Sequence, residues 1–157
     1  MIHGAGAPAF VMPRAIQTFE VSLKAAIFRE GRLLLLQEAD TGYWELPGGR
    51  IDVGEERLPH GDILAREIAE ELGSHVEIRA RAEAVTWVRQ RLTDDVFVFL
   101  VARLADFVDG DPCLSCEHRA AQWTTPADWA NLEFPPLSDY AEGLLRIWRL
   151  QLGIGSR

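Results

Sequence analysis

The sequence predicts one α/β domain, in which strands and helices are mixed along the chain. Its 157 residues suit a single domain that is large enough to bury a sizeable core. Hydrophobic residues make up 48% of the chain and charged residues 25%, as is usual for soluble globular proteins. The hydrophobic pattern follows the order strands, helix, strands, helix, which indicates a mixed α/β fold.

Apolar segments bounded by turn residues predict the strands. A turn at Glu30-Gly31 separates the first two strands, and Pro47-Gly48-Gly49 ends regular structure after a short extended segment at 44–46. The third of the longer strands is expected to be interrupted near Glu83-Ala84. The predicted strands cover 21–28, 32–37, 76–88, 96–102 and 121–123.

Helical spacing of apolar residues predicts two main helices. The first covers 62–72 and ends at Gly73, a residue that favours the position after a helix. The second is amphipathic, with apolar residues at helical spacing over 137–148, and a further helix start is expected at 125–128. The Gly-, Ala- and Pro-rich residues 1–17 are expected to form a loose arm before a single domain over 18–157.

Several classes of protein are disfavoured by the sequence. No apolar stretch has the length of a membrane span, and the first residues lack the basic and apolar regions of a signal peptide. We therefore expect a cytoplasmic protein with no membrane partner. Cys113 and Cys116 form a single C-x-x-C followed by His118, but a zinc site there would lack a fourth ligand, so ordinary loop cysteines are favoured.

Negative charge is concentrated in one part of the chain. The net charge is −8, and residues 45–77 contain nine acidic residues and three arginines, an excess of six acidic residues. Such a segment repels nucleic acid and phosphate unless a cation intervenes. Nucleic acid is therefore not expected as a partner.

The helix at 62–72 carries three glutamates close together. On a helical wheel its apolar residues lie on one side, and Arg66, Glu67, Glu70 and Glu71 lie on the other. Like charges at these spacings repel, and a solvated charged face is one interpretation. The other is a cation site, because carboxylates together with the carbonyls of a Gly48-Gly49 turn suit a hard divalent cation, above all Mg²⁺.

The segment from Gly49 to Gly73 resembles the Nudix box, G-x5-E-x7-R-E-U-x-E-E-x-G-U, where U is a bulky apolar residue. Gly49 and Glu55 match G-x5-E, and residues 66–73, with the sequence REIAEELG, match R-E-U-x-E-E-x-G without a mismatch. The resemblance to the Nudix hydrolase family implies a mixed β-sheet sandwiched between helices. It also implies Mg²⁺-dependent hydrolysis, with Mn²⁺ as an alternative, of a phosphoanhydride bond in a nucleoside diphosphate linked to another moiety.

The resemblance also implies roles for individual residues. Glu67, Glu70 and Glu71 hold the metal ions, with the carbonyl of Gly48 as a further ligand. Glu67 is the candidate for activating water, Arg66 fixes the directions of the box carboxylates, and Glu55 supports that network from its loop. A later loop often adds a carboxylate in this family, and Glu117 is the candidate here, with Asp94 and Asp95 as competitors.

Two departures from the box affect these expectations. Ten residues separate Glu55 from Arg66 instead of seven, and we place the three extra residues in the 58–61 loop. Ser74 occupies the last position of the box, where the family has a bulky apolar residue. The insertion bears on how Glu55 meets the helix, but it leaves the pattern within the helix intact.

The substrate is less well defined by the sequence, which favours a nucleoside di- or triphosphate or a nucleotide sugar. Substrate binding is predicted for four arginines that share strand faces in pairs, with a solvated strand face as the alternative: Arg79, Arg81, Arg89 and Arg91. Trp44, Trp87 and Phe134 could stack on a base, although core packing is the default for each. A non-catalytic nucleotide sensor and a diphosphate isomerase on the same fold remain alternatives, and a homodimer is left open.

Overall fold

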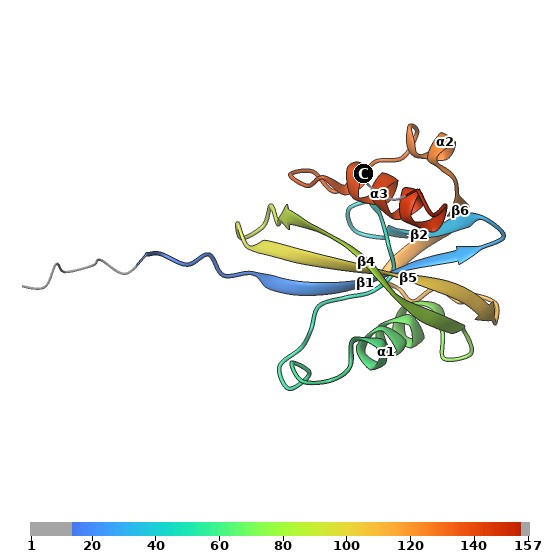
Figure 1. Ribbon diagram of the computed structural model, residues 1–157, viewed down its shortest axis with the longest axis horizontal. Helices are drawn as coiled ribbons and strands as arrows, with labels where there is room; N and C mark the ends of the chain where they lie inside the picture. Colours follow the sequence, from blue (N-terminus) through green and yellow to red (C-terminus); the bar gives the residue numbers. More distant parts are fainter. Residues whose placement is uncertain (1–13, 155–157) are drawn as a thin grey trace, which may run out of the picture.

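The computed structural model describes residues 14–154, and residues 1–13, which make up most of the predicted arm, lie outside the described residues. Arg14 to Phe19 have no regular secondary structure, and the elements after them follow in the predicted order (Figure 1). The strands are β1 (Glu20–Arg29), β2 (Arg32–Glu38), β3 (Trp44–Glu45), β4 (Glu77–Gln90), β5 (Phe97–Asp109) and β6 (His118–Thr124). The helices are α1 (His60–Leu72), α2 (Pro126–Trp129) and α3 (Tyr140–Gln151).

The strands form a mixed sheet with a helix against each face. Its order is β3-β2-β1-β5-β4, and β6 also pairs with β2. β1 and β5 are parallel, whereas the remaining pairs are antiparallel. Helix α1 covers one face and α3 the other, so the predicted sandwich is confirmed (Figure 1).

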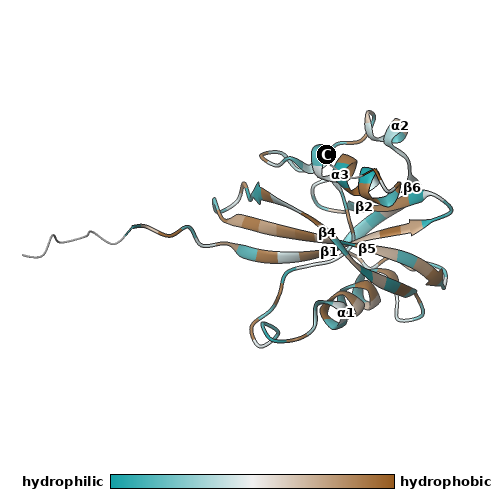
Figure 2. Ribbon diagram, viewed as in Figure 1, coloured by the Kyte–Doolittle hydropathy of each residue, from teal (hydrophilic) through white to brown (hydrophobic). Residues whose placement is uncertain are grey.

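The core is divided between the two faces by the alternation of side chains along each strand. In β1, Leu23, Ala25 and Ile27 pack on the α1 side, whereas Ala26 and Phe28 pack on the α3 side. Both faces are covered, which explains why β1 and β2 are apolar over long runs and not only at alternate positions. Figure 2 shows this as largely hydrophobic central strands, with hydrophobic and hydrophilic residues alternating along both helices.

The turn that follows β3 lies beside β1, where there is room because β2 moves away from β1. The hairpin turns at Glu30 and Gly31, both with positive φ, as the predicted turn requires. The two strands pair only next to this turn, after which β2 turns toward β3 and β6. The segment 47–51 takes its place beside β1: Leu23 N donates to Gly49 O at 2.8 Å and Ala25 N to Pro47 O at 2.8 Å. The predicted end of regular structure at 47–49 is therefore hydrogen-bonded to the sheet.

Several predicted boundaries were wrong. The helix α1 begins at His60 and not at residue 62, because Pro59 (φ −56°) provides a favourable entry to the first turn. His60 and Gly61 are thus helical, and the loop available for the insertion shrinks to 56–59. The strand β5 continues to Asp109 instead of 102, and α3 begins three residues after Leu137, whose φ of 51° is not helical. Within the described residues, no helix is long and apolar enough to cross a membrane.

Candidate active site

The helix α1 buries two of its glutamates together with its apolar residues. Its buried stripe repeats at i and i+4 and consists of Ile63, Leu64, Glu67, Ile68, Glu71 and Leu72. Glu67 is 9% exposed and Glu71 6%, whereas Ala65, expected on the apolar side, is exposed. The alternative interpretation of a solvated glutamate face therefore does not hold for Glu67 and Glu71, because the segment that pairs with β1 covers them.

The turn at Gly48-Gly49 meets this buried stripe directly. Gly48 N donates to Glu71 Oε2 at 2.8 Å, so the carboxylate fixes the turn to the helix. Gly48 has a φ of 121°, and a Cβ there would lie 2.3 Å from Leu23 O. A Cβ on Gly49 would lie 2.5 Å from both carboxylate oxygens of Glu67. Only glycine at both positions lets the backbone approach the two carboxylates this closely.

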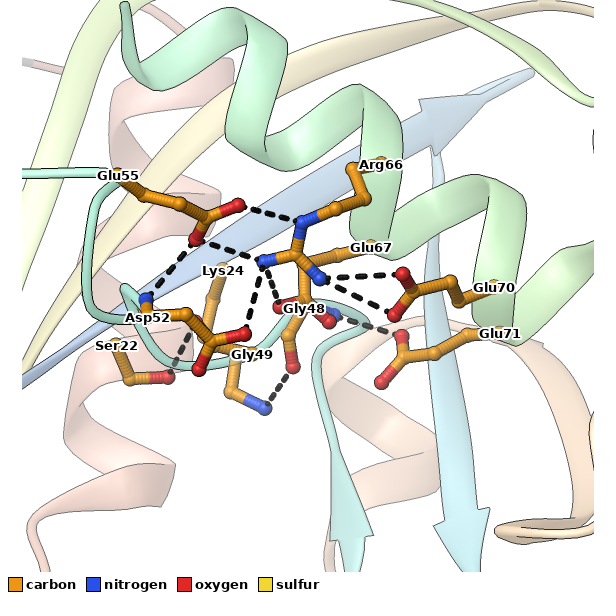
Figure 3. Close-up of polar contacts among 10 residues, drawn as sticks. All are labelled: Ser22, Lys24, Gly48, Gly49, Asp52, Glu55, Arg66, Glu67, Glu70 and Glu71. Atoms are coloured by element: carbon orange, nitrogen blue, oxygen red, sulfur yellow. Dashed lines mark hydrogen bonds and ion pairs between the residues drawn. The ribbon is translucent and has the colours of Figure 1, made fainter. Parts of the chain in front are cut away.

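Arg66 donates hydrogen bonds to three carboxylates, and the carboxylate of Asp52 lies 3.9 Å from its Nη2 (Figure 3). It forms a bidentate pair with Glu55, with Nε–Oε1 at 2.7 Å and Nη2–Oε2 at 2.9 Å. Nη2 also donates to Glu67 Oε1 at 2.9 Å, and Nη1 donates to Glu70 Oε2 at 3.1 Å. The hydrogen bonds from Arg66 lower the pKa of Glu55. The longer connection between Glu55 and the helix thus still brings Glu55 to Arg66.

The only lysine of the chain lies in the middle of this site. Lys24, on β1, is 8% exposed, and its Nζ donates to Gly48 O at 2.7 Å and lies 3.2 Å from Glu45 Oε2. Glu45 is 3% exposed and is also paired with Arg89. The sequence reasoning missed Lys24 and Glu45, although a single lysine within the apolar run of 21–28 was a usable signal. Gly48 O, a predicted metal ligand, already accepts a hydrogen bond from this ammonium.

These residues line a cavity of about 750 Å³ with eight acidic side chains and three basic ones. Burial, together with the charges of Glu67 and Glu117, raises the pKa of Glu71 to about 7, and burial also raises the pKa of Glu67. Crowded carboxylates in a partly buried site gain from a cation that neutralises them. Because the donors are carboxylate oxygens, the residues present fit a hard divalent ion.

The predicted accessory ligand lies beside the helix glutamates. Glu117 lines the same cavity, and ligand atoms of Glu71, Glu117 and His118 all lie within 4.8 Å of one another. Its competitor Asp94 is paired with Arg91 at 2.6 Å, and neither Asp94 nor Asp95 lines this cavity. His118 was not predicted for this cluster, because only the fold brings it to Glu71, 47 residues earlier.

The structure separates the four predicted substrate-binding arginines into two pairs. Arg79 lies 3.0 Å from Asp106 and Arg81 3.9 Å, and neither lines a cavity at the box. Arg89 and Arg91 line a second cavity of about 130 Å³, which shares Glu38, Thr41 and Glu45 with the first.

The three aromatic candidates pack as core residues. Trp87 is 6% exposed, and its ring meets that of Tyr140 edge to face. Phe134 stacks on Tyr140, and Trp44 packs against the same cluster. Tyr43, which was not singled out from the sequence, is the aromatic residue that lines the second cavity.

Comparison with known proteins identifies the family. The NUDIX domain matches residues 19–142, which is most of the chain. The chain belongs to the Nudix hydrolase family. The predicted family, fold and enzyme class are thereby confirmed, and with them the assignment to the pyrophosphohydrolases.

Relatives of this Nudix chain are found among sequences and solved structures. A "MutT-like protein" of Streptomyces ambofaciens is 38% identical over 107 residues, and the match covers 68% of this chain and 64% of that protein. A Mycobacterium tuberculosis protein named "Putative 8-oxo-dGTP diphosphatase 2" is 33% identical over 125 residues, covering 74% of this chain and 81% of the relative. The crystal structure of an ADP-ribose pyrophosphatase from Streptococcus suis is 28% identical with a TM-score of 0.64, covering 89% of this chain and 96% of that one.

Proposed function

We propose that this Nudix chain hydrolyses a phosphoanhydride bond of a nucleoside diphosphate linked to another moiety, in a reaction that depends on Mg²⁺ or Mn²⁺. The observation that carries the proposal is the placement of Glu67 and Glu71 against the Gly48-Gly49 turn, with Glu70 lining the same strongly acidic cavity. An acidic cavity accepts a phosphate only together with cations.

The metal would be held by Glu67, Glu70 and Glu71, with Glu117 as a further ligand. Gly48 O is a weaker candidate, because Lys24 already donates to it at 2.7 Å. When bound, divalent ions lower the pKa of a coordinated water and neutralise the phosphate oxygens.

The residues of the chain orient the reacting groups. Arg66 fixes the carboxylates of Glu55, Glu67 and Glu70, so that their directions do not change as the substrate enters. Glu67 is the proposed base that orients water toward one phosphorus atom. The water adds there and gives a proton to Glu67, the bridging oxygen leaves with the electron pair of its bond to that phosphorus, and two phosphate-bearing products result.

The second cavity is the proposed place for the substrate's nucleoside or its other moiety. It adjoins the phosphate site, and Tyr43, Leu92, Pro135 and Pro136 make much of its lining apolar, as stacking of a base requires. Arg89 adds hydrogen-bond donors at the boundary between the two cavities. Together with the name of the mycobacterial relative, this favours nucleoside triphosphates as the first substrates to test.

A nucleotide panel tests the proposal. The panel contains 8-oxo-dGTP, the ordinary nucleoside triphosphates, ADP-ribose and UDP-glucose, and chromatography measures the products with Mg²⁺, with Mn²⁺ and with excess EDTA. We expect turnover of at least one member with metal and none with EDTA, while circular dichroism stays unchanged. Binding of nucleotides without turnover would instead identify a non-catalytic sensor, and isomerisation of an isoprenoid diphosphate would identify a diphosphate isomerase.

A pair of variants separates the metal site from general effects of charge. Glu70→Gln should lower the rate by at least about 100-fold, since losing a metal ligand removes several kcal/mol of transition-state stabilisation. Glu83 lies on the exposed part of β4 and does not line the cavity. Glu83→Gln removes one negative charge, as Glu70→Gln does, and should keep the normal rate. Equal rates for the two variants would show that Glu70 is not a ligand of the metal site.

A further inference from the structure

An imidazole, that of His118, and a thiol, that of Cys116, line the acidic cavity together with its carboxylates. The segment 113–118 is held there by its backbone: Cys113 N donates to Leu72 O at 2.8 Å and Ser115 N to Glu71 O at 3.0 Å. On its other side, Ala39 N donates to Glu117 O at 2.8 Å. The segment is therefore attached both to the end of α1 and to the chain after β2.

The imidazole of His118 has unused hydrogen-bonding capacity inside this cavity. The side chain is 8% exposed, and its buried Nδ1 has no hydrogen-bond partner among residues 14–154. Its Nε2 lies 3.8 Å from Glu71 Oε1, which is longer than a hydrogen bond. A buried polar nitrogen without a partner costs about 1–3 kcal/mol. Hydrogen bonding within the part of the chain that the structure describes thus does not explain the placement of this ring.

The distances are close to those of ligands around one ion. Glu71, Glu117 and His118 each have one ligand atom within 4.8 Å of the ligand atoms of the other two. Ligands at about 2.1 Å from a tetrahedral ion are about 3.4 Å apart, so side-chain shifts of about 1 Å would complete the site.

The donor chemistry differs from that of a magnesium site. Mg²⁺ prefers oxygen ligands and retains water, whereas imidazole nitrogen favours ions of the zinc and cobalt kind. We propose that Glu71, Glu117 and His118 form a site for Zn²⁺ or a related transition-metal ion, with the Cys116 thiol, which lines the same cavity, available for the fourth position. Cys113 does not line this cavity.

Zinc at this site would compete with the proposed magnesium site, because both use Glu71 and Glu117. The expected consequence is that Zn²⁺ inhibits hydrolysis and that excess Mg²⁺ relieves the inhibition. This consequence rests on the proposed function, whereas the zinc site itself does not.

Cobalt binding, which needs no substrate, tests the site directly. Metal-free protein is titrated with Co²⁺ and followed by visible absorption. We expect one tightly bound ion in the wild type, and an affinity at least about tenfold weaker in His118→Gln. The matched control, His60→Gln, changes an exposed histidine at the start of α1 and should bind like the wild type. In Cys116→Ser, loss of the sulfur-to-cobalt absorption band would place the thiol in the fourth position.

Two results would overturn the proposal. One is equal Co²⁺ affinity in the wild type and His118→Gln, and the other is no Co²⁺ binding by the wild type. If His118→Gln does not fold, NMR of the histidine rings in the wild type gives the answer, since Zn²⁺ should shift the signals of His118 and leave those of His60 unchanged. Hydrolysis is measured separately, so a failure of the proposed function would appear in the nucleotide panel and not in this titration.

Discussion

The substitution Lys24→Met tests the buried charges that join β1, β3 and the glycine turn. Methionine keeps much of the lysine's length and removes its charge. In the folded protein it leaves Glu45, 3% exposed, with Arg89 as its remaining charged partner, and it leaves Gly48 O without the Lys24 hydrogen bond.

The expected cost follows from the geometry. Opposite charges 3.2 Å apart attract by about 5 kcal/mol at an effective dielectric constant of about 20. The lysine no longer has to be desolvated in the variant, and Arg89 still neutralises part of Glu45. The free energy of unfolding should therefore fall by about 2–4 kcal/mol, near the lower end of the range for breaking a buried ion pair. Such a loss is a large part of the usual stability of a domain.

Urea unfolding of metal-free protein measures this cost within a double-mutant cycle. Lys24→Met and Glu45→Gln are each expected to destabilise, and together they should cost at least about 1 kcal/mol less than the sum of the single changes. Arg50→Met is the surface control, since its pair with Glu20 is about half exposed and contributes less than about 1 kcal/mol. Additive effects in the cycle, or a Lys24→Met cost no larger than that of Arg50→Met, would refute the reasoning.

Three further variants test the turn, the helix and the loop. Gly49→Ala should abolish most activity with a smaller effect on stability, because the added Cβ would lie 2.5 Å from the Glu67 oxygens and displace that carboxylate; kinetics together with thermal melting measure both effects. Glu71→Gln should remove activity yet stabilise EDTA-treated protein at pH 8 by up to about 3 kcal/mol in urea unfolding. The reason is that its folded pKa of about 7 lies above the ordinary 4.5, so ionisation costs stability as the pH rises through that window. Deletion of 56–58, which are exposed and precede the helix, should leave a cooperatively folding protein, and loss of cooperative unfolding would show that the insertion is structural.

Local patterns predicted the strands, the helices and the box, because these depend on spacing within a few residues. Gly73 ends α1 with a φ of 98°, and Glu30-Gly31 forms the expected turn. The face of α1 was predicted less well. A helical wheel places Glu67 and Glu71 away from the apolar residues. Residues at the edge of the apolar side are buried or exposed depending on which other segment packs against them. A helical wheel does not show that the turn at Gly48 packs there.

Contacts between distant residues that the family resemblance does not imply were beyond sequence reasoning. The Lys24–Glu45 pair depends on the position of β3 beside β2, and the approach of His118 to Glu71 depends on the backbone bonds of 113–118. The arginines of β4, together with Arg91 just after it, show the same limit. Arg79 and Arg81 precede the register shift between Ala80 and Ala84 or lie within it, and they pair with Asp106, whereas Arg89 and Arg91 follow it and reach the second cavity.

The pairing of 47–51 with β1 has a consequence for how this scaffold can change over evolutionary time. The Gly48-Gly49 turn lies beside β1, in the position that β2 has left. The core therefore determines the conformation of this turn, and the length or composition of a surface loop does not. The second cavity has the opposite origin, because it is assembled from three separate connections around Tyr43, Leu92 and Pro135. Substitutions in those connections can change which substrate binds without changing the residues that are proposed to hydrolyse it.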